Sequence, residues 1–296
     1  MTLEQLRVFV AVAERLHVTR AAQALNMTQS AASSAVQALE ARIGTPLFDR
    51  VGRHIELTEA GRLFLPEAKA VLGRIAQAEQ VLDELAGLER GALAIHASQT
   101  VGSYWLPRLL HRFAEAHPRI SLPLTIGNTA EVARAVLDGS ADLGFVEGDV
   151  EDPLLARIPV GSDRLILVVG SGHPWAGRDD LDPGDLMRTR WVLRERGSGT
   201  RQVFEEAVRG YGLDPGLLTV AWTLPSNEAV RAAVEAGAGA TVISRLVAAP
   251  GLAAGSLTEL PLAFPERRFM ALRHGDRHRS RAETALLESI RSALPE

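Results

Sequence analysis

The sequence predicts an α/β fold of two lobes, preceded by a small, mostly helical domain and one long helix. Three patterns support this prediction. Apolar residues recur at helical spacing up to Ile43, an a/d repeat of apolar residues runs from Gly61 to Leu85, and short apolar strands alternate with helices from Gly91 onward. The chain of 296 residues is long enough for about two domains.

Three helices are expected at the N-terminus. Apolar residues at helical spacing predict a first helix over residues 3–15. Thr19 is the expected N-cap of a second, short helix over residues 20–25, and Thr28 is the expected N-cap of a third helix over residues 29–43. The second and third helices, joined by a brief turn, form a helix-turn-helix unit.

The predicted third helix has one apolar face and one polar face. Ala32, Val36, Leu39 and Ile43 are spaced to pack inward. The opposite face carries short hydroxyl and amide side chains, which can approach base edges and phosphates in a DNA major groove. The alternative is an ordinary solvated helix face. The candidate DNA-binding residues of this region are Thr19, Arg20, Thr28, Gln29, Ser30, Ser33, Ser34 and Gln37.

A hairpin is expected over residues 47–58, with Gly52 at its tip. Arg50 and Arg53 would then lie where a wing contacts DNA phosphates. The alternative is a surface loop with two solvated arginines. Charge alone does not indicate DNA binding, because residues 1–65 contain seven arginines and six acids and the whole chain has a net charge of -4.

A long helix is expected from Thr58 to about Arg90, with a kink at Pro66. Its a/d positions are apolar or small over roughly three and a half heptads, and one helix cannot bury such a seam alone. We therefore favour a partner helix from a second chain over packing onto the following domain. The seam residues are Gly61, Phe64, Ala68, Val71, Ile75, Ala78, Leu82 and Leu85.

The remainder of the chain alternates between strands and helices, which predicts two α/β lobes with a break near Asp163. The expected strands are 92–97, 120–126, 143–146, 165–169, 191–193, 218–222, 240–244 and 269–272. The expected helices are 104–117, 129–137, 200–210, 227–236 and 280–294.

Two strand-to-helix loops, 97–102 and 196–201, contain the main candidate ligand-binding residues. Free backbone N–H groups and the helix dipole make such helix ends suitable for anions, and Ser and Thr hydroxyls add donors. The alternative is simple helix capping by these hydroxyls. The candidate effector-binding residues are Ser98, Gln99, Thr100, Asn128, Thr129, Glu147, Ser198, Gly199 and Thr200.

Several motifs that occur in order resemble the LysR-type transcriptional regulators. They are the run 6–14, the helix 19–25, the segment 28–40 and the wing 47–61. The recognition helix departs from the usual pattern. Ser30 stands where a proline is common, and Ser34 and Ala35 stand where Arg and Gln are common.

The resemblance implies a domain organisation. A winged helix-turn-helix would occupy residues 1–60, a dimerising linker helix 58–90, and an effector-binding domain of periplasmic-binding-protein-like fold 91–296. Within the last domain, one lobe would contain about 91–162 with 266–296, and the other 163–265.

The resemblance also implies a function. The chain would bind double-stranded operator DNA as a homodimer or homotetramer in the cytoplasm and would sense a small anionic metabolite, with RNA polymerase as a candidate partner. It would have no enzymatic activity, no cofactor and no contact with a membrane. Residues 191–201 are similar to the branch that regulates carbon fixation and sulfur assimilation, so sulfite, sulfate, a carboxylate and a phosphorylated metabolite are the candidate effectors.

The main alternative is an anion-binding protein without a transcriptional role, such as a transport receptor. The chain has no cysteine, no apolar run long enough to span a membrane, and no histidine pair at metal-ligand spacing on a predicted helix. Its N-terminus is expected to be an amphipathic helix, not a signal peptide. The acidic residues between Asp138 and Asp152 are expected to be solvated around a strand.

Overall fold

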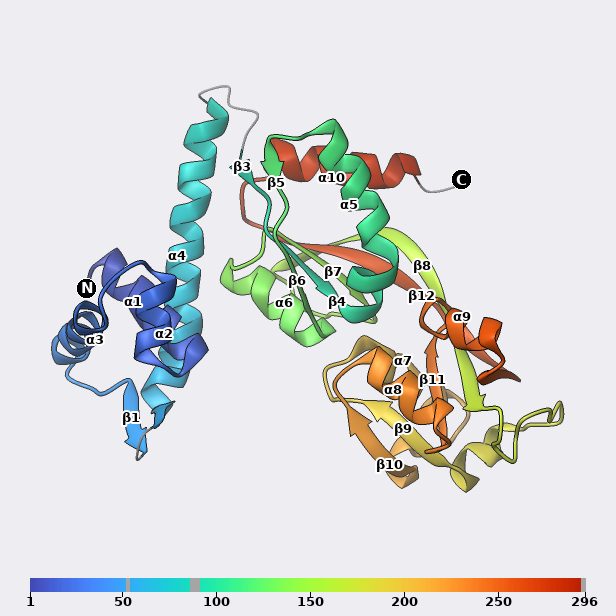
Figure 1. Cartoon of the computed structure of the whole chain (residues 1–296). Coiled ribbons are helices and arrows are strands. Elements are labelled where there is room, and N and C mark those ends of the chain that lie inside the picture. Colours follow the sequence, from blue (N-terminus) through green and yellow to red (C-terminus); the bar gives the residue numbers. More distant parts are fainter. Residues whose placement is uncertain (52–53, 86–90, 294–296) are drawn as a thin grey trace. The chain divides into compact units, whose positions relative to one another are not determined.

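The computed structural model describes residues 1–51, 54–85 and 91–293 (Figure 1). The chain divides into two compact units. The first comprises Met1–Gly87 with Leu137–Ser140, and the second comprises Leu88–Val136 with Ala141–Glu296. Among the described residues, no helix is both long enough and apolar enough to cross a bilayer.

The first unit contains helices around a small hairpin. Its elements are α1 (Leu3–Arg15), α2 (Val18–Ala24), α3 (Gln29–Ile43), β1 (Phe48–Val51), β2 (His54–Leu57) and α4 (Glu59–Leu85). β1 and β2 are antiparallel, as the predicted wing requires. The predicted tip of the wing at residues 52–53 and the predicted continuation of the long helix over residues 86–90 lie outside the described residues.

The caps of the helix-turn-helix differ in one respect from the prediction. Thr28 caps α3 as expected, because its Oγ1 accepts a hydrogen bond of 3.2 Å from the amide of Ala31. Thr19 is not the cap of α2. The helix begins at Val18, and the Nδ1 atom of His17 accepts from the amide of Arg20 at 3.4 Å. A ring nitrogen therefore replaces the hydroxyl that we expected, and Thr19 lies within the first turn.

The core under α3 contains most of the predicted inward face. Ala32 and Val36 pack with residues of α1 and α2, and Leu39 packs with Phe9 of α1. Ile43 was expected to be buried with them but is 43% exposed. It is the last residue of α3, which ends at the left-handed Gly44, beyond the part of the helix that α1 and α2 cover.

The linker helix α4 buries only the first part of its seam within the chain. Ala68 is fully buried in the cluster with Leu6 and Phe9, and the ring of Phe64 lies 5.2 Å from that of Phe9. Val71 is 43% exposed and Leu82 is 66% exposed. The expectation that the whole seam faces a partner helix is therefore wrong for its N-terminal positions, because α1 covers them.

The second unit contains the remaining elements. They are β3 (Gly91–Ala92), β4 (Ile95–Ser98), the π-helix η1 (Val101–Trp105), α5 (Leu106–Ala116), β5 (Ile120–Ser121), β6 (Leu124–Gly127), α6 (Thr129–Asp138), β7 (Leu143–Glu147), β8 (Leu155–Gly170), the 3₁₀-helix η2 (Pro183–Arg188), β9 (Arg190–Arg194), α7 (Gly199–Gly210), the 3₁₀-helix η3 (Pro215–Leu217), β10 (Thr219–Leu224), α8 (Asn227–Glu235), β11 (Ala240–Ser244), α9 (Arg245–Ala254), β12 (Leu257–His274) and α10 (Arg281–Ala293).

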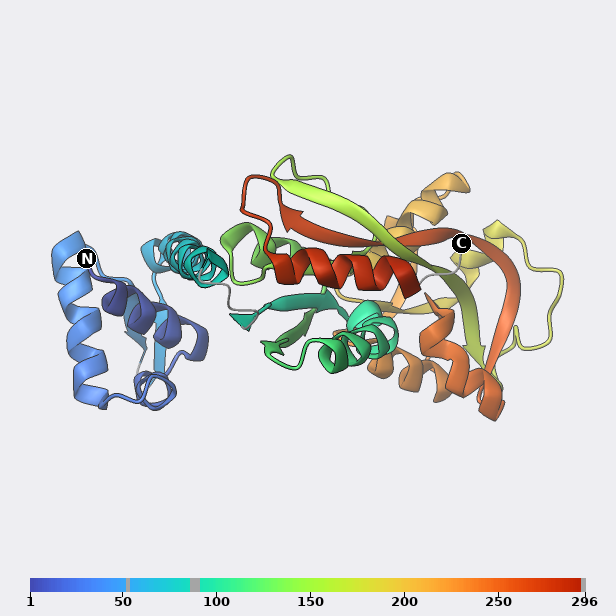
Figure 2. The same cartoon turned by 90° about the horizontal axis from the view of Figure 1, so that it is seen from above.

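Two long antiparallel strands, β8 and β12, connect the two lobes of this unit (Figure 1, Figure 2). The strand order is β10-β9-β11-β8-β12-β7-β4-β6. We call β4, β6 and β7 with α5, α6 and α10 the first lobe, and β9, β10 and β11 with α7, α8 and α9 the second lobe. Asp163 and Arg267 are opposite each other on the ribbon of β8 and β12.

Each lobe has its own apolar core. In the first lobe, β4 and β7 pack with α5 and α10 around Phe113 and Phe145. In the second lobe, one cluster forms around Trp191 and Phe204 and another around Val234. These cores fix the strand ends and helix starts that form the polar network between the lobes.

Several predicted elements of this unit need correction. The expected strand 120–126 is divided into β5 and β6, because Pro123 has no N–H for a sheet ladder; its carbonyl accepts from Ile95 at 2.9 Å. β8 runs through Asp163 without interruption, so the predicted lobe boundary near this residue lies within a strand. The strands expected at 165–169 and 269–272 are parts of β8 and β12, and helix α9 was not predicted.

Candidate functional site

The predicted DNA-binding side chains of α2 and α3 face solvent, with Ser33 half-buried. Their hydrogen bonds are short-range along the helix. Thr28 and Ser30 share a hydroxyl contact of 3.1 Å, and the amide of Gln29 donates to Ser33 at 3.5 Å. Arg50 lies on β1 opposite Ile55, whereas Arg53 lies outside the described residues.

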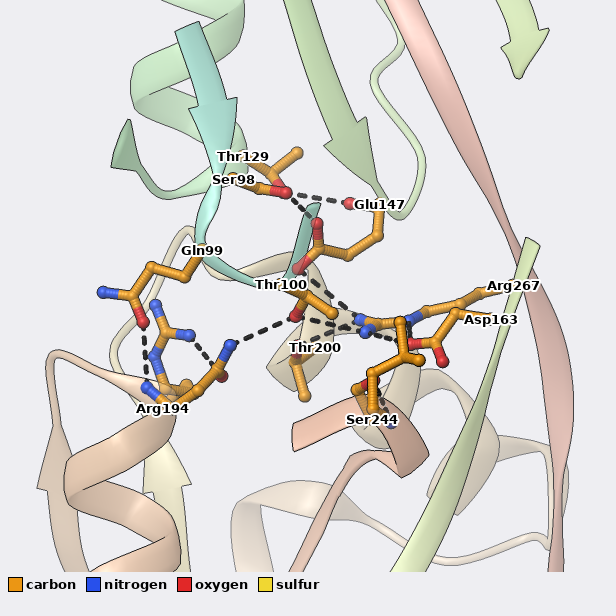
Figure 3. A network of polar contacts seen from close by, with 12 residues as sticks. Ser98, Gln99, Thr100, Thr129, Glu147, Asp163, Arg194, Thr200, Ser244 and Arg267 are labelled. Atoms are coloured by element: carbon orange, nitrogen blue, oxygen red, sulfur yellow. Dashed lines mark hydrogen bonds and ion pairs between the residues drawn. The ribbon is translucent and has the colours of Figure 1, made fainter. Parts of the chain in front are cut away.

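The two predicted ligand loops of the second unit meet in a buried polar network (Figure 3). Ser98 and Thr100 come from the first lobe, and Ser198 and Thr200 come from the start of α7 in the second lobe; all four are buried. A Cβ atom on Gly199 would lie 2.0 Å from the carbonyl oxygen of Glu147. Only glycine permits this close approach of α7 to the end of β7.

A buried arginine that was not predicted lies between these loops. Arg267 of β12 is 4% exposed, and its Nη1 and Nη2 atoms donate to Thr200 and Thr100 at 2.9 and 3.3 Å (Figure 3). Its Nε and Nη2 atoms both bind Oδ2 of Asp163, at 3.1 and 2.7 Å. Hydroxyls of both lobes are thus joined through one guanidinium group.

Glu147 is a second buried carboxylate beside this arginine. Its Oε1 lies 3.6 Å from Nη1 of Arg267, and its Oε2 accepts a hydrogen bond from Ser98. Thr129 donates to its backbone carbonyl at 2.9 Å. The acidic residues between Asp138 and Asp152 were expected to be solvated, which is wrong for Glu147, because it is 2% exposed at the end of β7.

A second arginine, Arg194 of β9, extends the network. It binds its neighbour Glu195 through two hydrogen bonds of 2.8 and 2.9 Å, and its Nη1 donates to Asn227 at 2.6 Å. Asn227 in turn donates to Thr100 at 3.1 Å. Burial alone would raise the pKa of Glu195, but the hydrogen bonds and charge of Arg194 outweigh it and lower that pKa.

Further contacts join the two lobes at the edge of this network. Gln99 donates to the carbonyl of Pro225 and accepts from the amide of Asn227, both at 2.8 Å. Asn128 donates to Glu195 at 3.3 Å. Tyr104 donates to Glu228 at 2.8 Å, and burial together with this carboxylate raises the pKa of the tyrosine to about 12.

The contacts separate the predicted effector-binding residues into two groups. The side chains of Ser98, Gln99, Asn128 and Thr129 donate hydrogen bonds to other groups of the protein. Thr100 and Thr200 instead accept from Arg267, so that their own hydroxyl hydrogens remain for another acceptor. Ser198 makes no side-chain capping bond.

Asp163, Arg194, Asn227 and Arg267 were missed by the sequence analysis. Asp163, Asn227 and Arg267 have partners that are distant in the sequence. Arg194 binds its neighbour Glu195, but its contact with Asn227 spans 33 residues. Asp163 was predicted only as the position near which the two lobes divide.

Two family models match the chain. The model of the LysR substrate binding domain matches residues 86–295, and that of the bacterial regulatory helix-turn-helix protein of the lysR family matches residues 3–62. Together they account for both units of the structure.

Individual relatives agree with these matches. The HTH-type transcriptional regulator YeiE of Escherichia coli K12 is 34% identical over 97% of this chain and 96% of its own length. A probable RuBisCO transcriptional regulator of Nostoc sp. PCC 7120 is 32% identical over 98% of this chain and 87% of its own length. The latter name matches the carbon-fixation branch that residues 191–201 suggested.

A solved structure resembles the second unit. The regulatory domain of CcmR from Synechocystis PCC6803 in complex with 2-PG is 26% identical, with a TM-score of 0.63 over 69% of this chain and 97% of that domain. Members of the matched family are transcriptional regulators, not enzymes. With its N-terminal helix-turn-helix and its two-lobed α/β domain, the chain belongs to the LysR family of transcriptional regulators.

Proposed function

We propose that this regulator senses a small anion between the loop at residues 98–100 and the loop at residues 197–200. The observation that carries the proposal is the start of α7. Ser198 occupies the N-cap position and is buried, yet its side chain makes no capping hydrogen bond. Elsewhere in the chain, Thr28 and Ser226 make such bonds. The first-turn amides of α7 thus receive no hydroxyl from their cap and suit an anion.

Two further observations support an anion. Thr100 and Thr200 retain hydroxyl hydrogens that can donate to a ligand oxygen. The similar CcmR domain was solved with 2-PG. We therefore place a phosphorylated metabolite first among the candidate effectors, followed by sulfite, sulfate and a carboxylate.

Thermal unfolding of the full chain tests this proposal. An anion that binds only the folded state stabilises it by about 2.7 kcal/mol at a concentration 100 times its Kd. We expect at least one of 2-PG, phosphate, sulfite and sulfate to raise the Tm in this way. Thr100→Val should reduce the shift, whereas Thr219→Val, at an exposed position on β10, should not. If none of these anions changes the Tm of the parent chain, the effector is not such an anion.

We further propose that the exposed face of α3 binds the major groove and that the wing contacts phosphates. Gln29, Ser33 and their neighbours present hydroxyl and amide groups to solvent, as base readout requires. Gln29→Ala should change the ranking of DNA sequences, whereas Arg50→Ala should weaken binding to all of them and reduce the salt slope by about 1. Binding titrations at several salt concentrations separate these outcomes, and a change of preference from Arg50→Ala would reverse the assigned roles.

The exposed half of the α4 seam is consistent with a homodimer or homotetramer in the cytoplasm, where the chain meets DNA. Leu82 lies on the seam and Leu63 lies off it, and both are exposed in the single chain. Leu82→Glu should therefore lower the assembled mass measured by light scattering, because the charge would be buried without a partner. Leu63→Glu should leave that mass unchanged.

A further inference from the structure

The guanidinium group of Arg267 is held in place by the ribbon that joins the lobes. Arg267 on β12 and Asp163 on β8 are opposite each other in the strand register, and both Nε and Nη2 bind the same carboxylate oxygen. The arginine and aspartate side chains are only 2% and 3% exposed. Because two donors on one edge of the group are fixed by Asp163, the orientation of its other edge is also fixed.

That other edge points at the proposed anion site. Nη1 donates to Thr200 at 2.9 Å, and Nη2 donates to Thr100 at 3.3 Å. Since each hydroxyl accepts from the arginine, its own hydrogen turns away from the guanidinium group and is left for a third group. Arg267 therefore orients one donor from each lobe.

The contact of Arg267 with Glu147 is the longest of its contacts. Nη1 and Oε1 are 3.6 Å apart, which is longer than a hydrogen bond, whereas Glu147 already has a hydrogen bond from Ser98. A ligand oxygen that binds Nη1 on the side of Glu147 would replace no hydrogen bond of Arg267. Glu147 would keep its hydrogen bond from Ser98.

The charges of the neighbouring side chains also indicate Arg267 as the group that would bind an anion. Arg194 and Glu195 neutralise each other, so Arg267 is the positive charge that contacts both ligand loops, and Asp163 and Glu147 bring two negative charges. The helix end of α7 supplies only roughly half a positive charge. The formal charges of Arg267, Asp163 and Glu147 sum to one negative, whereas without Arg267 an anion would face two uncompensated carboxylates.

We propose that Arg267 is a direct ligand of the effector anion and determines the preference of this site for anions, and that Asp163 is its positioning residue. The proposal deepens the proposed function and rests on it. The anion would bind Nη1 of Arg267 together with the hydroxyls of Thr100 and Thr200.

Calorimetric titration of the full chain with 2-PG, phosphate and sulfite tests the role of Arg267. Replacing Arg267 alone would leave Asp163 buried without a partner, so we pair Arg267→Gln with Asp163→Asn, which removes both charges and keeps a polar side chain at each position. This double variant should raise the Kd of the anion about tenfold or more, because a hydrogen bond to a charged group is lost. Arg268→Gln, on the same strand but exposed, should leave the Kd unchanged.

Two measurements distinguish an anion ligand from a purely structural residue. A structural role would lower the Tm of the double variant and leave the Kd near that of the parent, which would overturn the proposal. Where the double variant does not fold, Arg267→Lys decides, since it keeps the charge but not the planar fork; a parent-like Kd would again overturn the proposal. A parent chain that binds none of the three anions would instead contradict the proposed function itself.

Discussion

The recognition helix and the polar network between the lobes contain the same kinds of polar residue in opposite settings. On α3, Ser, Thr and Gln are mostly exposed, and their bonds reach at most four residues along the helix. In the network between the lobes, Ser98, Thr100 and Thr200 are buried. Ser98 binds Glu147, 49 residues away, and Thr100 and Thr200 bind Arg267, 167 and 67 residues away. The first surface is open to an external partner, whereas in the second Thr100 and Thr200 are held by Arg267 and keep only their hydroxyl hydrogens for one.

This difference has an energetic consequence. Removing a solvated hydroxyl or amide from α3 should change the free energy of unfolding little, because water replaces its contacts. Water does not replace the contacts of a buried charge in the network between the lobes, since the cost of its desolvation is offset only by its protein partners. The two regions should therefore differ strongly in their tolerance of mutation.

Asp163→Ala should produce the largest effect. It would leave the Arg267 guanidinium with Glu147 at 3.6 Å as its remaining carboxylate, and breaking a buried ion pair costs about 3–5 kcal/mol. Ser34→Ala on the exposed face of α3 should change stability by no more than about 0.5 kcal/mol. Urea unfolding of both variants measures the difference. Equal losses of stability would mean that water reaches the network around Arg267 and that the two regions do not differ in their tolerance of mutation.

Gly199→Ala should produce the next largest effect. Its Cβ would lie 2.0 Å from the backbone oxygen of Glu147, so either α7 or β7 must move, at a cost of about 1–3 kcal/mol. Gly210→Ala, at the other end of the same helix, meets nothing within 4 Å and should be neutral or stabilising by about 0.4–1 kcal/mol. Thermal unfolding compares the two alanines directly, and a parent-like Tm for Gly199→Ala would show that the lobes can separate at this point without cost.

The same contrast explains what could be predicted from the sequence. The exposed face of α3 and the helices that support it follow from local spacing and from the Thr28 cap. The strand-to-helix loops between the lobes also have a local pattern. In the structure, their buried residues Thr100 and Thr200 both accept hydrogen bonds from Arg267. Arg267 itself has no local signal, because what makes it important is a pairing with Asp163 across two long strands.

The errors have related causes. His17 replaces Thr19 as the cap of α2, since a ring nitrogen was not considered as an acceptor. Asp163 was predicted only as the position of a lobe boundary, but its carboxylate binds Arg267, which is 104 residues away. The first error concerns a local contact between His17 and Arg20, whereas the role of Asp163 depends on a contact that only the fold creates.

The smallest expected effect compares two helix caps, one in each region. Thr28→Ala removes the hydroxyl that accepts from the amide of Ala31, and loss of such a cap costs about 1 kcal/mol. Ser198→Ala removes a hydroxyl from the same position of α7, but that hydroxyl makes no capping bond, so the cost should be under about 0.5 kcal/mol. Urea unfolding in buffer without phosphate, sulfite or sulfate is the appropriate measurement, because a bound anion would stabilise the native state of either variant. A cost for Ser198→Ala as large as that for Thr28→Ala would show that Ser198 caps α7 in solution. The first-turn amides of α7 would then have a partner within the chain, and the observation that carries the anion site would be removed.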